Sequence, residues 1–158
     1  MNAPFNENSA NAGFAPRNDE AQAPELLNRT ARDRDDMLWT TLRAEAVQEC
    51  IEERALKPLY AAVLHAKSFE EALILRLSVR LDHPSLPADA LRPILLESIL
   101  ADASIGQAAR ADLSAVVERD PASGRLLEPF LFFKGYAAIQ THRLAHWLWE
   151  AGKRDMAL

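Results

Sequence analysis

Asp120 opens a short polar interruption between two apolar, helix-like stretches in the segment VVERDPASGRLLEPFLFFKGY, residues 116–136. The four residues DPAS place Asp first and Pro second, with Gly124 just beyond, which is typical of a turn. A carboxylate at such a point can also face a substrate. Asp120 is therefore either a turn former or a substrate-binding carboxylate, and the local sequence alone favours the turn.

His142 and His146 are four residues apart on a predicted helix, the spacing at which two imidazoles can share a metal ion. The Glu of an HExxH motif is absent, because Arg143, Leu144 and Ala145 fill the interval. No third ligand is obvious nearby. We therefore expect no metal site here, but one packed and one exposed histidine in an aromatic-rich helix.

Cys50 is the single cysteine, so the chain cannot form an internal disulfide, and one free thiol suits a reducing cytoplasm. Glu49 and Glu52 flank it and disfavour a thiolate nucleophile.

His65 and His83 lie at predicted helix ends, where a cation or a cap suits the helix dipole. Glycine-rich phosphate loops and GxSxG motifs are absent, so the residues alone do not form a self-sufficient active site.

Length and composition fit one ordinary globular domain, with 158 residues, 49% hydrophobic and 26% charged. The formal net charge of −5 argues against nucleic acid as a partner. The sequence contains neither an apolar run of roughly 18 residues, which a membrane span needs, nor the plan of a signal peptide. We expect a cytoplasmic protein that does not bind membranes.

The chain divides by composition near residue 34. Residues 1–34 are rich in Asn, Ala and Pro and lack a sustained apolar period, so they cannot offset their ordering entropy by burial. We expect a mobile N-terminal extension, with a short helix near Glu25–Asn28, and a partner-binding tail is the alternative. Residues 35–158 form the predicted folded domain.

Helical periodicity runs through the folded domain, and Leu38, Leu42 and Ala46 make one apolar stripe at a spacing of four. Ser68 and Glu71 form a predicted capping box at the start of a helix that is apolar on most sides and therefore central. We expect an all-α fold of six to eight helices, without a strand, and with helices over 35–55, 57–66, 68–82, 88–102, 104–120 and 128–152.

Several helix ends are predicted from single residues. Asp89 as N-cap would place Pro93 at the fourth helical position, where its missing N–H costs little. Ser104 is the expected cap of the next helix. Pro129 can start the last helix and Gly152 can end it.

Aromatic residues crowd the last predicted helix and cover more than one of its faces. Some can fill the core, but the rest need another covering surface, which in a soluble protein usually marks a subunit contact. We therefore expect self-association through this cluster, which consists of Phe130, Phe132, Phe133, Tyr136, Trp147 and Trp149.

Three segments together resemble the N-terminal domain of bacterial serine O-acetyltransferases. They are WTTLRAEA at 39–46, VVERDPA at 116–122 and PFLFFKGYAAIQTHRLAHWLWEAGKR at 129–154. The last is the most specific, with Lys134-Gly135, Gln140, Arg143 and His146-Trp147-Leu148-Trp149 in the family order. The resemblance covers about Leu38 to Leu158 and omits the residues before 35.

The resemblance implies an enzyme that transfers the acetyl group of acetyl-CoA to L-serine, the first step of cysteine biosynthesis. In the family a C-terminal left-handed β-helix holds the acetyl-CoA cleft and the catalytic histidines, and this chain does not contain it. We therefore expect no catalytic and no cofactor-binding residue in these 158 residues, no activity of the chain alone, and a piece of a longer enzyme.

The same resemblance assigns a role to Asp120. In the family the Asp of RDPA helps to hold the amino-acid substrate, and cysteine, the feedback inhibitor, occupies the same site. A carboxylate suits this role because serine and cysteine both present an ammonium group that a charge-assisted hydrogen bond can orient. Asp120 is accordingly the one substrate-binding residue that we expect in this chain.

The family also implies partners. Its helical domains join trimers into a homo-oligomer, a hexamer that is a dimer of trimers, and its far C-terminal tail binds cysteine synthase. Because that tail is absent here, this segment should not bind cysteine synthase. Two other readings stay open, a stand-alone helical adaptor with an aromatic binding face and a small helical ligand binder that uses His142 and His146.

Overall fold

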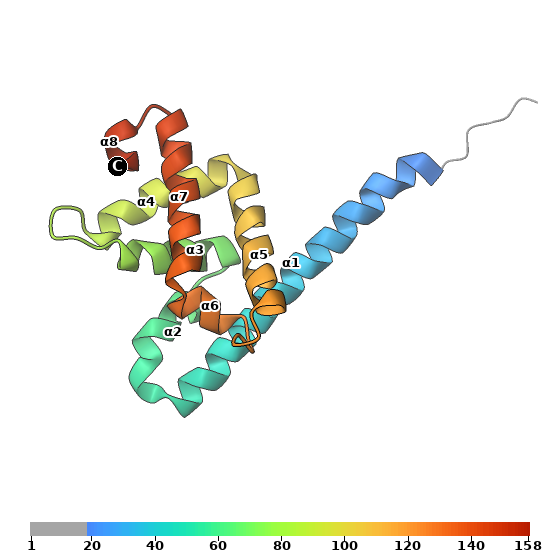
Figure 1. Cartoon of the computed structure of the whole chain (residues 1–158), viewed down its shortest axis with the longest axis horizontal. Helices are drawn as coiled ribbons and strands as arrows, with labels where there is room; N and C mark the ends of the chain where they lie inside the picture. The colour runs from blue at the N-terminus through green and yellow to red at the C-terminus, as the bar shows by residue number, and fades with distance from the viewer. Residues whose placement is uncertain (1–18) are drawn as a thin grey trace, which may run out of the picture. The chain divides into compact units, whose positions relative to one another are not determined.

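The computed structural model describes the backbone of residues 19–158 and the side chains of residues 33–158 (Figure 1). Over these residues the fold is all-α, as the periodicity predicted, with eight α-helices, one 3₁₀ helix and no strand. None of the described helices is both long enough and apolar enough to cross a membrane. The elements are α1 (Asp19–Glu52), η1 (Arg54–Leu56), α2 (Lys57–Leu64), α3 (Phe69–Arg80), α4 (Ala88–Ala101), α5 (Ala103–Arg119), α6 (Leu127–Phe132), α7 (Lys134–Glu150) and α8 (Arg154–Ala157).

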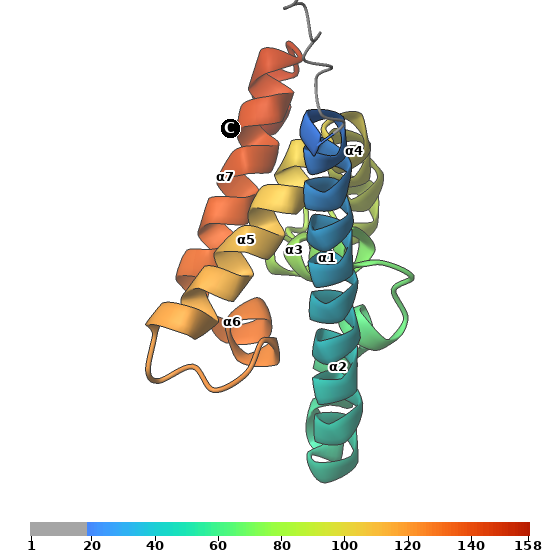
Figure 2. The ribbon, with the colours of Figure 1, turned by 90° about the vertical axis from the view of Figure 1, so that its right-hand side faces the viewer.

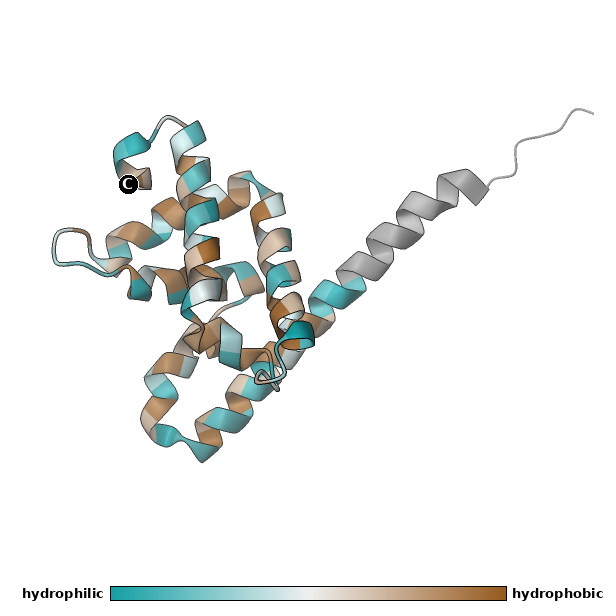
Figure 3. Ribbon diagram, in the orientation of Figure 1, coloured by the Kyte–Doolittle hydropathy of each residue, from teal (hydrophilic) through white to brown (hydrophobic). Residues whose placement is uncertain are grey.

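Residues 34–158 form one compact unit around a single apolar core. Helix α3 supplies the largest share of its buried side chains, because it is apolar on most sides and packs against both α2 and α4. The predicted stripe on α1 is confirmed, since Leu38, Leu42 and Ala46 are all buried. In Figure 3 brown and teal residues alternate along most helices of this unit, as expected of helices that bury one face.

Helix α1 begins sixteen residues earlier than the sequence predicted, at Asp19 instead of Asp35. The predicted helix started where its apolar periodicity starts. A backbone can be helical without burying an apolar stripe, so the helix can extend beyond the periodic residues. Ala, Glu, Leu and Arg, which are frequent between residues 19 and 34, favour a helix without any apolar face. The expected mobility of residues 1–34 stays a prediction, and residues 1–18 lie outside the described part of the chain.

The Ser68 half of the predicted capping box is confirmed, because the Ser68 hydroxyl accepts a hydrogen bond from the Glu71 amide at 3.3 Å. The Glu71 carboxylate accepts the amide of Lys67 at 2.7 Å and not that of Ser68. The predicted cap of α4 is wrong. This helix begins at Ala88, whose amide donates to the Asp82 carboxylate at 2.7 Å, so a residue of the preceding loop takes the role expected of Asp89. Pro93 consequently lies at the sixth helical position and not at the fourth.

The expected cap of α5 was wrong by two residues. Asp102 has an extended backbone and its carboxylate accepts a hydrogen bond from the Ser104 amide at 2.9 Å, so Asp102 is the N-cap. The end of α7 is as predicted. Gly152 takes a left-handed φ of 79°, which costs least for glycine, and the Lys153 amide beyond it closes on the Leu148 carbonyl at 2.9 Å.

The predicted helix 128–152 is two helices, α6 and α7, separated at Phe133, whose ψ of 115° is extended. In a continuous helix the Leu131 carbonyl would accept the amide of Gly135. Here it accepts hydrogen bonds from Arg76 and Arg80 of α3 instead. Arginines of a distant helix thus satisfy the carbonyl that the break leaves free, and these donors cannot be inferred from residues 128–152 alone.

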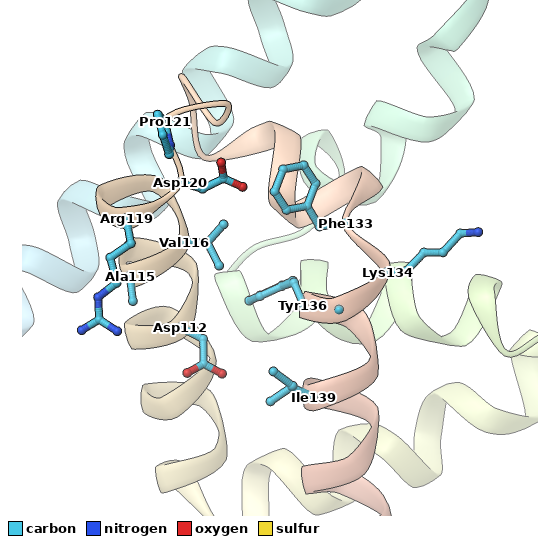
Figure 4. A pocket seen from close by; sticks show the side chains of 11 residues that line it. Asp112, Ala115, Val116, Arg119, Asp120, Pro121, Phe133, Lys134, Tyr136 and Ile139 are labelled. Atoms are coloured by element: carbon cyan, nitrogen blue, oxygen red, sulfur yellow. The ribbon is translucent and has the colours of Figure 1, made fainter.

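Helices α5 and α7 lie side by side in Figures 1 and 2. The labelled residues in Figure 4 show that they run in opposite directions, since α5 ascends from Asp112 to Asp120 while α7 descends from Lys134 to Ile139. The end of α5 therefore lies near the start of α7, and the segment that joins α5 to α6 passes over this point.

Candidate functional site

Asp120 is the C-terminal cap of α5, with an extended backbone at φ −97° and ψ 106°. Its Oδ1 accepts a hydrogen bond from the Ala122 amide at 2.9 Å, and its carbonyl accepts one from the Ser123 amide at 2.9 Å. DPAS is therefore a turn closed by the aspartate itself, as the sequence predicted. The turn uses only one of the two carboxylate oxygens.

The Oδ2 atom of Asp120 has no hydrogen bond or ion pair with any residue that the structure describes. The side chain is half-buried. In Figure 4 the carboxylate points into the gap between α5 and α7, toward Phe133, whereas Arg119 and Lys134 point away from it. One oxygen of Asp120 is thus available to a ligand on this side.

A hollow of about 720 Å³ lies between α5 and α7 beside Asp120. Its walls are largely apolar, and its two carboxylates, Asp112 and Asp120, stand eight residues apart on one helix. Eight residues correspond to about 12 Å along an α-helix, too far for both to hold one ammonium group. The lining residues are Asp112, Ala115, Val116, Arg119, Asp120, Pro121, Phe133, Lys134, Gly135, Tyr136 and Ile139 (Figure 4).

Asp112 joins the two walls of the hollow. Its Oδ2 accepts a hydrogen bond from Gln140 at 2.9 Å and a charge-assisted one from Arg143, which also donates to the Gln140 amide oxygen at 2.6 Å. Burial acts to raise the pKa of Asp112, but the bonds from Arg143 and Gln140 outweigh it and hold the pKa below its ordinary value. Asp112 is therefore an ionised structural link between α5 and α7.

Tyr136 lines the hollow from α7. It is almost fully buried, and its hydroxyl donates to the Ala109 carbonyl at 3.1 Å. Burial raises the pKa of Tyr136 far above its ordinary value, so the phenol stays protonated and cannot serve as a base.

The segment 120–126 is tied to α1 at its far end. The Glu45 carboxylate accepts hydrogen bonds from the amides of Leu126 (3.3 Å) and Leu127 (2.7 Å), where α6 begins. Glu49, one turn further along α1, forms an ion pair with Arg125. Neither glutamate was predicted as a site residue, and Glu49 was considered only as a neighbour of Cys50. Their only signal is that they follow Leu42 and Ala46 at the border of the buried stripe.

The histidines do not build a site. His142 and His146 are both exposed, with ring centroids 6.5 Å apart, so the expectation of one packed histidine was wrong. The helix faces solvent at both positions, because Leu144 and Leu148 take the buried side. His65 caps the end of α2 and His83 accepts the Ser85 amide at 3.2 Å. Among the residues that the structure describes, no three His, Cys, Asp or Glu side chains gather as metal ligands.

The aromatic cluster contains both buried and exposed side chains, as its distribution over more than one helix face suggested. Phe130 and Tyr136 are buried in the core, and Phe133 and Trp147 pack partly against it. Phe132 and Trp149 remain 45% and 42% exposed. Two large aromatic side chains on α6 and α7 are thus left open to solvent.

The family model described as "Serine acetyltransferase, N-terminal" matches residues 38–141. The chain belongs to the serine acetyltransferase family, as the three sequence segments indicated.

The similarity to known proteins extends over most of the chain. It is 42% identical over 125 residues to a probable serine acetyltransferase 3 of Oryza sativa subsp. japonica, covering 78% of this chain and 42% of that protein. The crystal structure of serine acetyltransferase from Vibrio cholerae superimposes with a TM-score of 0.76 at 39% identity, covering 78% of this chain and 48% of that one. A serine acetyltransferase in complex with cysteine superimposes with a TM-score of 0.76 at 32% identity, covering 78% and 52%. The chain thus spans about half the length of these relatives or less.

Proposed function

We propose that this chain is the N-terminal helical domain of a serine O-acetyltransferase and that it contributes Asp120 to the site for L-serine and for the inhibitor cysteine. In the reaction the serine hydroxyl oxygen bonds to the acetyl carbon of acetyl-CoA, the carbon–sulfur bond breaks, and the hydroxyl proton leaves with the CoA thiol. The base and the acetyl-CoA cleft for this step lie, in the proposal, outside these 158 residues.

The observation that carries the proposal is the divided use of the Asp120 carboxylate. One oxygen closes the turn through the Ala122 amide, which fixes the direction of the other. The carboxylate as a whole faces the hollow between α5 and α7 (Figure 4), and its other oxygen has no partner among the described residues. An oriented carboxylate of this kind suits an ammonium group, which offers three N–H donors and a positive charge.

Membership of the family and the cysteine complex of a related serine acetyltransferase support this ligand class. Serine and cysteine differ in a hydroxyl and a thiol, but they share the ammonium and carboxylate groups. A contact to the ammonium alone cannot distinguish the two molecules. Asp120 should therefore serve substrate binding and feedback inhibition equally, while acetyl-CoA, which lacks an amino-acid ammonium, should not depend on it.

Assembly is the second part of the proposal. Phe132 and Trp149 offer exposed aromatic area on α6 and α7, and aromatic residues are enriched where subunits meet. We assign this surface to contacts between copies of the domain, as in the hexamer, a dimer of trimers, that the resemblance implies. Cysteine synthase would bind elsewhere, through a C-terminal tail of the longer enzyme.

The test is Asp120→Asn in the full-length enzyme, with serine, acetyl-CoA and cysteine varied in turn. Asn keeps the oxygen that closes the turn, so the free energy of unfolding should change by less than about 1 kcal/mol. Loss of a charge-assisted bond should cost roughly 1.5–3 kcal/mol, which is about one to two powers of ten in kcat/KM for serine. Cysteine inhibition should weaken in parallel, and the KM for acetyl-CoA should stay nearly constant.

Glu118→Gln is the matched control, because it removes an equal charge from an exposed position on the same helix, two residues away and outside the hollow. Unchanged serine kinetics and cysteine inhibition in Asp120→Asn would reduce Asp120 to a turn residue. Equal losses for serine and acetyl-CoA, with a large fall in melting temperature, would indicate a folding defect and also contradict the proposal.

A further inference from the structure

The segment that begins with Asp120 has two ends, and they are held by different helices. At the near end Asp120 continues directly from α5, and its amide donates to the Val116 carbonyl at 2.9 Å. At the far end the Glu45 carboxylate of α1 accepts the amides of Leu126 and Leu127. Glu45 and Leu127 are 82 residues apart in the sequence, so this is a tertiary contact and not a local turn.

Hydrogen bonds link residues inside the segment, where the Ser123 hydroxyl donates to the Arg125 carbonyl at 3.5 Å. The Ser123 amide donates to the Asp120 carbonyl at 2.9 Å, and the Ser123 side chain is 6% exposed. Arg125, two residues on, forms the ion pair with Glu49. Within the described structure, every side-chain hydrogen bond that reaches residues 120–127 from another helix comes from Glu45 or Glu49 of α1.

We infer that Glu45 is a positioning residue for the Asp120 carboxylate and acts through the segment 120–126. This inference rests on the proposed function of Asp120. Glu45 touches neither the hollow nor Asp120, and its effect is to fix the far end of a seven-residue connection whose near end carries the ligand-binding group.

The chemistry of the anchor explains why a glutamate is needed. The first amides of a helix have no partner within that helix, and α6 has only six residues with no side-chain cap of its own. One carboxylate supplies both acceptor oxygens and a negative charge at the positive end of the helix. Without it the two amides would turn toward water, and among the described contacts to α1 only the ion pair of Arg125 with Glu49 would hold the far end of the segment.

The first experiment measures amide hydrogen exchange in this 158-residue chain with Glu45→Ala. The diagnostic amides are Ala122 and Ser123, which bond to Asp120 and do not touch Glu45. We expect their exchange to accelerate at least about tenfold, while the amide of Leu77 in the core of α3 keeps its wild-type rate. Glu45→Gln, which retains one acceptor oxygen, should give an intermediate acceleration and serves as the second variant if alanine prevents folding.

Glu52→Ala is the matched control on the same helix, because the Glu52 carboxylate accepts a hydrogen bond from Gln48 on α1 and lies outside the anchor. It should leave both diagnostic amides unchanged. Wild-type exchange at Ala122 and Ser123 in both Glu45 variants would overturn the inference. Equal acceleration everywhere, including Leu77, would also overturn it, because Glu45 would then act on global stability alone.

The second experiment measures kinetics in the full-length enzyme. Glu45→Ala should raise the KM for serine about tenfold and weaken cysteine inhibition alike, with the KM for acetyl-CoA within about twofold of wild type. In the Asp120→Asn background the same substitution should add almost nothing, because the group it positions is already lost.

The two proposals fail in different ways. If Asp120→Asn leaves serine kinetics unchanged while Ala122 and Ser123 still exchange faster in Glu45→Ala, the function of Asp120 is wrong and only the anchor remains. If Asp120→Asn weakens serine binding but Glu45→Ala and Glu45→Gln do not, the positioning role is wrong and the function of Asp120 stands.

Discussion

The guanidinium group of Arg76 on α3 donates two hydrogen bonds to the carbonyl oxygen of Leu131 on α6, from Nη2 at 2.6 Å and from Nε at 3.3 Å. Arg80 adds a third donor at 3.2 Å. Burial, together with the neighbouring Arg80, lowers the pKa of Arg76 from its ordinary value, but the group remains charged at neutral pH. The negative end of α6 thus meets two cations, and its positive end meets Glu45.

Replacing Arg76 by Met should destabilise the domain by about 1–2 kcal/mol, because the fully buried Leu131 would lose its nearest donors and retain only Arg80. Urea denaturation followed by circular dichroism measures this. Arg92→Met is the control, since Arg92 pairs with the exposed Asp89 on the same helix and should cost less than about 0.5 kcal/mol. Equal effects of the two substitutions would contradict a structural role for the Arg76 contact.

Asp112→Asn should lower stability in a pH-dependent way. The folded pKa of Asp112 lies below its ordinary value of 3.8, so its contribution is present above about pH 4 and is lost as the pH falls through the folded pKa. The stability gap between wild type and Asp112→Asn should therefore be largest near pH 7 and close below about pH 4. Denaturant titrations from pH 7 to pH 3 would reveal it. The exposed Glu118→Gln should show a much smaller gap, and a gap that widens in acid would contradict this role of Asp112.

The 158-residue chain alone should not release CoA from acetyl-CoA in the presence of serine. Acyl transfer to a hydroxyl needs a base within hydrogen-bond reach and donors for the oxyanion, and neither is assigned among the described residues. A thiol reagent follows the reaction directly, with the full-length enzyme as the positive control. Serine-dependent turnover by the pure chain would mean that the chemistry lies within it after all.

Self-association should depend on the exposed aromatic residues of α6 and α7. Light scattering at micromolar concentrations should give a mass above the 17.6 kDa of one chain. Phe132→Ser or Trp149→Ser should weaken association about tenfold, as expected when an aromatic contact worth somewhat over 1.4 kcal/mol is lost. Leu100→Ser removes an even more exposed apolar side chain on α4 and should have no effect. If the chain is a monomer at every concentration, the prediction is wrong, and assembly would depend on parts of the protein outside this chain.

Local patterns predicted the fold well where the decisive forces are local. The Leu38, Leu42 and Ala46 stripe, the Ser68 cap and the Gly152 terminus all follow from periodicity or backbone preference, and the structure has each of them. The division between α6 and α7 could not be predicted in this way. The carbonyl that the break leaves free is satisfied by Arg76, which reaches Leu131 across 55 residues of sequence.

In the candidate site, too, the residue recognisable from local sequence was predicted and the residue that acts through a long-range contact was not. Asp120 could be found because an Asp-Pro turn has a recognisable sequence and because the flanking segments resemble a family. Glu45 could not, since a glutamate on an amphipathic helix usually faces water, and only the folded chain shows that its carboxylate meets the start of α6. Sequence therefore indicated the residue that we propose to meet the ligand but not the residue that we propose to position it.

The separation of Glu45 and Leu127 has a consequence for biosynthesis. A ribosome adds roughly 5–20 residues per second, so Leu127 is added about 4–16 s after Glu45. During that interval α1, α2 and α3 can meet, but the carboxylates of Glu45 and Glu49 remain hydrated and without their partners. The turn at Asp120 should therefore reach its final geometry only after the start of α6 has been added, when α1 to α5 have already been made.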